Sequence, residues 1–67
     1  MKKIKIGIFG PFGRMGKDII EQIVNFDSLK LSFLCEKKNH RSIGKKIKDI
    51  TIEDSIEDLI NASDVII

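Results

Sequence analysis

Residues 10–16 read Gly-Pro-Phe-Gly-Arg-Met-Gly, so a glycine recurs at every third position. Glycine-rich turns that join a strand to a helix bind phosphates, because backbone N–H groups at the helix N-terminus point toward the ligand. In such a turn Gly10 permits a tight exit from the strand, and Gly13 lets the backbone approach a ligand. Gly16 lets the helix pack closely against the sheet. The pattern therefore predicts a site for a ligand that carries phosphates.

The residue types in this turn limit which groups can bind a phosphate. Pro11 has no N–H group to donate. The expected donors are the next four residues, Phe12, Gly13, Arg14 and Met15. The Arg14 side chain would add a charge-assisted contact. Two alternatives stay open: Phe12 packs beside an adenine or covers the turn, and Met15 belongs to the turn or to the buried face of the helix.

A second residue with suitable chemistry is Glu36, which stands twenty residues after Gly16. An acidic residue at this distance, at the end of the second strand, accepts hydrogen bonds from the adenosine ribose hydroxyls of a dinucleotide. Lys37 and Lys38 follow directly, and together with Arg41 they would neutralise a 2′-phosphate on that ribose. The sequence therefore predicts a site that accepts NADPH or NADH, with Glu36 and Lys37 among the cofactor-binding residues.

The glycine spacing leaves one alternative. The pattern G-x-x-G-x-x-G is one residue longer than the strict dinucleotide-binding pattern G-x-G-x-x-G. A glycine-rich turn that binds no ligand would also fit these residues. The flanking strand and helix, together with Glu36, favour a nucleotide.

Three predicted elements position the turn and the acidic residue. Apolar and polar residues alternate over residues 3–9, which predicts a strand that begins half exposed and ends buried. From Arg14 the apolar residues recur at helical spacing, until residues 25–28 end the helix. Alternation returns over residues 29–35 and predicts a second strand, in which Cys35 is a small buried residue. Strand, helix and strand form a βαβ unit with parallel strands.

The second half of the chain predicts shorter elements. We expect a loop over residues 37–48 and a short strand over residues 50–52. A capped helix over residues 56–61, begun by Asp54 or Ser55, should precede a buried parallel strand over residues 65–67. The expected fold class is α/β: a Rossmann-type parallel sheet, the N-terminal part of an NAD(P)-binding domain.

Composition excludes several classes of function. The 67 residues are 42% hydrophobic and 33% charged, which indicates one small folded unit and not a disordered chain. No apolar run reaches the roughly 18 residues of a membrane span, so no membrane partner is expected, and a cytoplasmic location is the default. One cysteine and one histidine are too few for a catalytic triad or a metal site. His40 is interpreted as an ordinary loop histidine.

The net charge of +2 is unevenly distributed along the chain. Residues 37–48 hold six cations and no acid, whereas residues 49–67 hold six acids and no base. A solvated loop is the usual explanation for such a run. All four phenylalanines lie outside the basic segment and no nucleic-acid-binding module is present, so no nucleic-acid partner is expected.

At the turn the sequence resembles a known family. Residues 6–16 resemble the N-terminal signature of the 4-hydroxy-tetrahydrodipicolinate reductase (dihydrodipicolinate reductase) family, and Gly-Arg-Met-Gly at 13–16 is the specific part. Glu36-Lys37 is similar to the acidic-then-basic pair of that family, which is associated with the use of either cofactor. Residues 54–67 resemble its short helix and following strand, whereas the resemblance is diffuse over residues 39–50.

The resemblance implies hydride transfer from NADPH or NADH to a small-molecule substrate, a cyclic unsaturated dicarboxylate, in lysine and diaminopimelate biosynthesis. It also implies a homotetramer whose catalytic residues lie beyond Ile67, so no catalytic residue is assigned. The chain ends inside an apolar run, and we expect residues 1–67 to be the N-terminal part of a dinucleotide-binding domain without its substrate and tetramerisation domain. Two alternatives are another NAD(P)-dependent oxidoreductase with this turn and a non-catalytic Rossmann nucleotide-binding module.

Overall fold

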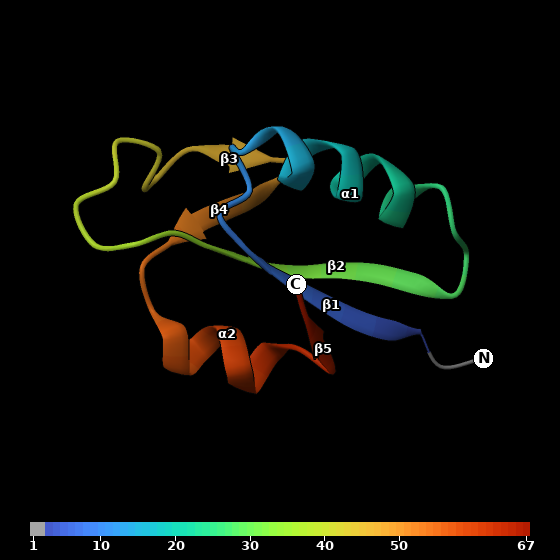
Figure 1. Cartoon of the computed structure of the whole chain (residues 1–67). Helices are drawn as coiled ribbons and strands as arrows, with labels where there is room; N and C mark the ends of the chain where they lie inside the picture. The colour runs from blue at the N-terminus through green and yellow to red at the C-terminus, as the bar shows by residue number, and fades with distance from the viewer. Residues whose placement is uncertain (1–2) are drawn as a thin grey trace.

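A mostly parallel sheet lies between two helices in the computed structural model, which describes residues 3–67 (Figure 1). The elements in chain order are β1 (Ile4–Phe9), α1 (Arg14–Val24), β2 (Leu29–Cys35), β3 (Lys46–Ile47), β4 (Ile50–Glu53), α2 (Ile56–Ala62) and β5 (Val65–Ile66). The predicted strand–helix–strand unit is confirmed, and its second strand has the predicted bounds.

The strand order is β3-β4-β2-β1-β5. β2, β4 and β5 each run parallel to their inner neighbour, and β3 alone is antiparallel. The chain adds β2 and then β4 on one side of β1, and it returns across the sheet to place β5 on the other side. The order therefore reverses at β1, and α1 and α2 cover opposite faces (Figure 1). This is the topology of a Rossmann-type α/β sheet, as predicted.

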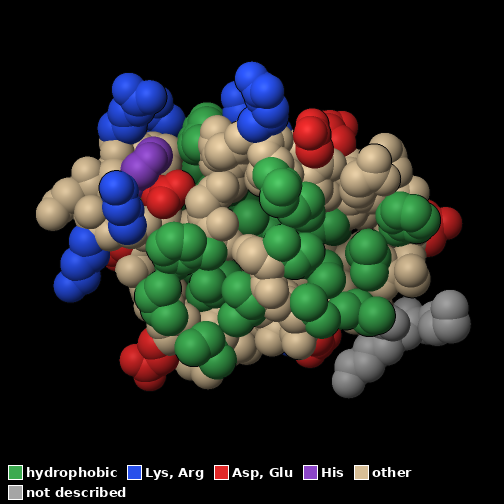
Figure 2. Space-filling view, viewed as in Figure 1, with side chains coloured by type: hydrophobic (Ala, Val, Ile, Leu, Met, Phe, Trp, Pro, Cys, Tyr) green, Lys and Arg blue, Asp and Glu red, His purple; other side chains and the backbone are tan. Residues whose placement is uncertain are grey.

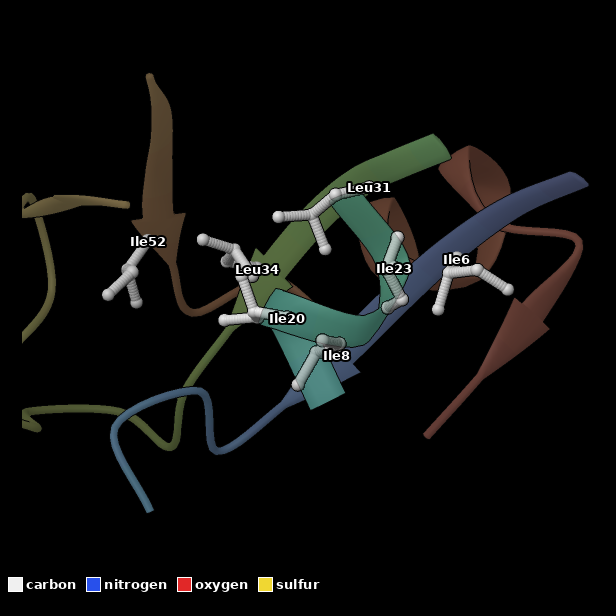
Figure 3. Packing of buried hydrophobic residues seen from close by; sticks show 7 residues of the cluster. All are labelled: Ile6, Ile8, Ile20, Ile23, Leu31, Leu34 and Ile52. Atoms are coloured by element: carbon white, nitrogen blue, oxygen red, sulfur yellow. The ribbon is translucent and has the colours of Figure 1, made fainter. Parts of the chain in front are cut away.

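The core lies between α1 and the sheet (Figure 3). Its buried members are Ile6, Ile8, Ile20, Ile23, Leu31, Leu34 and Ile52. Ile20 and Ile23 are three positions apart and therefore share one face of α1, which packs on β1 and β2. Met15 lies outside this face with 75% of its surface exposed, so of its two predicted roles the one on the buried face of the helix is contradicted.

α2 packs on the opposite face of the sheet, where Gly7 of β1 leaves room for it. A Cβ at Gly7 would overlap Ser63 Oγ and would lie 2.6 Å from Leu59 Cδ1. Leu59 is 2% exposed and is the buried residue of α2. An isolated glycine inside a strand often marks such a close approach.

The N-terminus of α2 is capped by a side chain. Ser55 Oγ accepts a hydrogen bond from the Asp58 N–H group at 3.1 Å, so Ser55 is the cap between the two predicted candidates. Glu57 and Asp58 occupy the first turn, where the helix dipole stabilises acidic residues. The helix begins at the predicted residue and ends one residue later than predicted.

The predicted loop over residues 37–48 contains a short strand, so the prediction is wrong at Lys46–Ile47. Lys46–Ile47 forms β3 and pairs with β4 through a two-residue turn, Lys48-Asp49. Both turn residues have positive φ values of 51° and 67°, as a tight hairpin requires. Two-residue hairpin turns of this kind usually have glycine at their second position, where this chain has Asp49. The sequence therefore gave little indication of the hairpin.

The last strand is correctly predicted as parallel but is not buried. β5 pairs with β1 and forms the edge of the described sheet. Val65, Ile66 and Ile67 are each between 43% and 51% exposed. Apolar side chains also gather on the face shown in Figure 2. An apolar run alone indicates a strand but does not say whether anything covers its outer edge.

Candidate functional site

The carboxyl ends of β1 and β2 lie at the same edge of the sheet, and the glycine turn and the basic loop begin there (Figure 1). Gly10 leaves β1 with a φ of +78°, a conformation that favours glycine, and its N–H group donates to Cys35 O at 2.9 Å. The predicted tight exit at Gly10 is therefore confirmed. This bond also joins the turn to the end of β2.

Gly16 has a different partner from the one predicted. A Cβ there would lie 2.7 Å from Gly10 O and 2.9 Å from Pro11 O. The close approach is thus between the helix and the backbone of the turn, and not between the helix and the sheet. Gly16 fixes the shape of the turn because no side chain separates it from those oxygens.

Gly13 has no comparable packing contact. A Cβ there would meet only Gly10 O, at an ordinary distance of 3.5 Å. Gly13 is the N-cap of α1 and has no side chain, so no cap bond forms. The N–H groups of Arg14 and Met15 in the first helical turn are thereby left available. The Gly13 N–H group itself donates to Gly10 O at 3.2 Å, within the turn, and its role as a donor to a ligand stays a prediction.

A pocket of about 570 Å³ opens beside this turn, a volume suited to a small ligand. Its lining residues are Phe12, Gly13, Lys17, Glu36, His40, Arg41, Ser42 and Lys45. Three of the predicted site residues are among them. The other five are Gly10, Pro11, Arg14, Met15 and Lys37, and they do not line this pocket.

Glu36 is the acidic group of the pocket and is only 8% exposed. Its Oε1 accepts a hydrogen bond from the Lys37 N–H group at 3.1 Å, which holds the carboxylate in place. Its Oε2 lies 3.9 Å from His40 Nε2 and 4.0 Å from the position that a Cβ on Gly10 would occupy. One carboxylate oxygen is thus fixed, while the other faces the glycine turn and the pocket.

His40 belongs to the loop, as predicted, and its side chain also lines the pocket. The interpretation as an ordinary loop histidine did not include this position in the pocket. Its Nδ1 accepts a hydrogen bond from the Ser42 N–H group at 3.1 Å and lies 2.7 Å from Ser42 Oγ. Because Nδ1 is an acceptor, we assign the ring proton of the neutral side chain to Nε2, which faces Glu36. The only sequence signal was the four-residue separation of Glu36 and His40.

The rest of the pocket wall is basic. Lys17 of α1 and Arg41 and Lys45 of the loop contribute three cations, against the one carboxylate of Glu36. Two of them lie near the Phe12 ring, with Lys17 Nζ 5.7 Å and Lys45 Nζ 6.0 Å from its centroid. Figure 2 shows the histidine and several basic side chains at this end of the molecule. Such a surface attracts anions.

Other chemistry has less support within residues 3–67. No group of three or more His, Cys, Asp or Glu residues there is arranged to hold a metal ion. No helix in that range has the length and apolar character needed to cross a membrane. Cys35 is fully buried as predicted, and burial, together with the nearby carboxylates of Asp54 and Glu36, raises the pKa of its thiol. A protonated buried thiol is a poor nucleophile.

The strand order, the glycine turn and the acidic residue after β2 define a Rossmann-type domain. Residues 4–67 match the family model described as dihydrodipicolinate reductase, N-terminus. The chain therefore belongs to the dihydrodipicolinate reductase family, as its turn indicated.

Individual relatives agree with this assignment. The whole chain is 40% identical over 67 residues to the 4-hydroxy-tetrahydrodipicolinate reductase of Pelagibacter ubique (strain HTCC1062), covering 25% of that protein. It is 32% identical over 74 residues to the reductase of the same name from Ehrlichia ruminantium (strain Gardel), covering all of this chain and 28% of that protein. The chain spans about a quarter of the length of these relatives. No solved structure matches it significantly.

Proposed function

We propose that this chain binds NADPH or NADH as the cofactor-binding part of a 4-hydroxy-tetrahydrodipicolinate reductase. The observation that carries the proposal is the open side of Gly13, which borders a pocket whose one carboxylate is Glu36. Nothing in the described packing requires a glycine at position 13. A bound phosphate would require one, because a side chain there would extend toward the ligand.

The turn residues fit the pyrophosphate of such a cofactor. The N–H groups of Arg14 and Met15 stand in the uncapped first turn of α1, and the helix dipole adds partial positive charge there. Phe12 lines the pocket beside them. Pro11 is buried and, together with Gly10 and Gly16, gives the turn its shape. In this proposal the five residues that do not line the pocket act through their backbone or through the neighbouring surface.

Glu36 fits the adenosine ribose. Its Oε1 is already bound to the Lys37 N–H group, so Oε2 is the oxygen that would accept from a ribose hydroxyl. The nicotinamide supplies the hydride when the cofactor is bound. The role of this chain's own residues is to hold and orient the cofactor at the carboxyl ends of β1 and β2.

For the whole protein we propose reduction of a cyclic unsaturated dicarboxylate in lysine and diaminopimelate biosynthesis, in the cytoplasm and as a homotetramer. The names of the relatives support the reductase activity. We place the substrate-binding and catalytic groups outside residues 1–67.

The test is an amide NMR titration of the chain with NADPH and then with NADH at one fixed salt concentration. We expect the largest shifts at residues 10–16 and 36–38. Gly13→Val should lose at least ten-fold in affinity with an unchanged circular dichroism spectrum, because its branched side chain would occupy the phosphate site. Dispersed spectra without shifts would contradict the proposal and favour a non-binding module. An unchanged affinity in Gly13→Val would contradict the role of the turn.

A further inference from the structure

The imidazole ring of His40 has a different neighbour at each of its two nitrogens. Its Nδ1 accepts a hydrogen bond from the Ser42 N–H group at 3.1 Å and lies 2.7 Å from Ser42 Oγ. Its Nε2 lies 3.9 Å from Glu36 Oε2, which is longer than a hydrogen bond. The neutral ring is therefore bonded to Ser42 on one side and only close to the carboxylate on the other.

The backbone around His40 is fixed, while its ring stays accessible to solvent. The His40 N–H group donates to Lys37 O at 3.1 Å, and its carbonyl accepts from the Ile43 N–H group at 3.1 Å. Ile43 packs against the hydrophobic core, and Ser42 is 3% exposed. The His40 side chain is 26% exposed, so it can exchange protons with water.

A proton on Nδ1 of His40 changes both contacts of the ring. The protonated nitrogen is a donor, so it can no longer accept from the Ser42 N–H group. The positive ring is at the same time attracted to the Glu36 carboxylate, which is 8% exposed and therefore weakly screened by solvent. We expect the charged ring to leave the Ser42 N–H group and to approach Glu36 Oε2 to hydrogen-bond distance.

Histidine is the side chain of this pocket whose charge ordinarily changes between pH 5 and 8. The other charged residues that line the pocket are Glu36 directly after β2, Lys17 of α1, and Arg41 and Lys45 of the loop. Carboxylate, lysine and arginine side chains ordinarily keep their charge over that range. A change with pH in what Glu36 can bind is therefore expected to come from His40.

We propose that His40 is a positioning residue for the Glu36 carboxylate, and that its protonation withdraws Oε2 from a bound nucleotide. This inference rests on the proposed function, in which Oε2 accepts from a hydroxyl of the adenosine ribose. Neutral His40 leaves that oxygen available, whereas protonated His40 donates to it and offsets its charge. The ribose contact is therefore strong above the pH at which His40 gains its proton and weak below it.

The test compares ADP with 2′-deoxy-ADP, which differ in one ribose hydroxyl. Because their phosphates are the same, the attraction of the phosphates to the basic pocket cancels in the ratio of the two dissociation constants. Calorimetric titration of the full chain at fixed salt should favour ADP by at least about five-fold at pH 8 and by less than about two-fold at pH 5.5. The sequence has one histidine, so a single imidazole NMR signal reports its protonation. The ratio should change over the same pH range as that signal.

Two kinds of variant separate the role of His40 from a general effect of pH. His40→Asn removes the titrating ring and keeps an oxygen that can accept from the Ser42 N–H group, so the preference for ADP should stay at its pH 8 value at both pH values. His40→Gln removes the same titration with a longer side chain and gives a second test. Lys38→Ala is the matched control, because Lys38 is exposed in the same loop and does not line the pocket. It should keep the pH dependence of the wild type, and circular dichroism checks that each variant is folded.

The outcomes separate this inference from the proposed function. A preference for ADP that does not change with pH in the wild type would overturn the inference. The same change with pH in the folded His40 variants, or a change outside the pH range of the imidazole signal, would also overturn it. In each of these cases both nucleotides bind, so the proposed function stands. If the wild type binds neither nucleotide at pH 8, the proposed function fails and the inference fails with it.

Discussion

Gly7 and Ser63 are in contact where α2 packs on β1. The effects of substituting them on the free energy of unfolding should therefore not be additive. A Cβ at Gly7 would overlap Ser63 Oγ. It would also lie 2.6 Å from Leu59 Cδ1, the end of a side chain that can rotate, and 3.0 Å from Ser63 Cβ, a tight contact that a small shift relieves. Ser63 Oγ is buried and has no hydrogen-bond partner among residues 3–67. The hydroxyl group is therefore the main obstacle to an alanine at position 7, and it makes no bond that would be lost on its removal.

The expected changes in the free energy of unfolding follow from these contacts. Gly7→Ala should gain about 0.5–1 kcal/mol from reduced freedom of the unfolded chain, and it should lose about 1–3 kcal/mol through overlap. The expected net loss is about 1–2 kcal/mol. Ser63→Ala should be neutral or gain up to about 1 kcal/mol, because it removes an unpaired buried hydroxyl. With the hydroxyl absent, Gly7→Ala should cost at least about 1 kcal/mol less than it does in the wild type.

Urea unfolding followed by far-ultraviolet circular dichroism measures the four free energies of the cycle. The unfolded-state effect of Gly7→Ala cancels in the cycle, which leaves only the contact. Ser55→Ala is the matched control, since it is a serine-to-alanine change at the other end of the same helix and should add to Gly7→Ala without coupling. Additivity between Gly7→Ala and Ser63→Ala would refute the packing argument, as would equal coupling to both serines.

Three further predictions concern single features. Ser55→Ala alone should destabilise the fold by about 1 kcal/mol in the same urea assay, because it removes the cap on the Asp58 N–H group; a change below 0.3 kcal/mol would argue against the cap. The Cys35 thiol should resist a disulfide reagent at pH 8 until the chain unfolds, and fast labelling of the native chain would contradict its burial. Because folding raises the pKa of this thiol, its contribution to stability should decline as alkaline pH ionises the thiol in the unfolded chain. Lys48→Ala should cost less than about 0.5 kcal/mol, because its 3.3 Å pair with Glu21 joins two largely exposed side chains; a loss above 1 kcal/mol would show that the pair is worth more than its exposure suggests.

Much of the fold was predictable because its signals are local. The change from two-residue to helical periodicity at Arg14 and back at Leu29 reports which face each element buries. The confirmed βαβ unit follows from those patterns together with the turn. The prediction was wrong where the signal was weak or absent: β3 begins inside a charged run, and the exposure of β5 depends on its neighbours rather than its own residues.

The candidate site was likewise predictable from the sequence only in part. The sequence alone determined the glycine turn and placed Glu36 at the end of β2, because a parallel βαβ unit brings those two chain segments to one edge. Only the tertiary structure decided that His40 and Lys45 line the pocket and that Lys37 does not. The physical reason is that side-chain directions in an irregular loop follow from long-range anchors. Here these anchors are the burial of Ser42 and the backbone bonds to Ile52, which no local periodicity encodes.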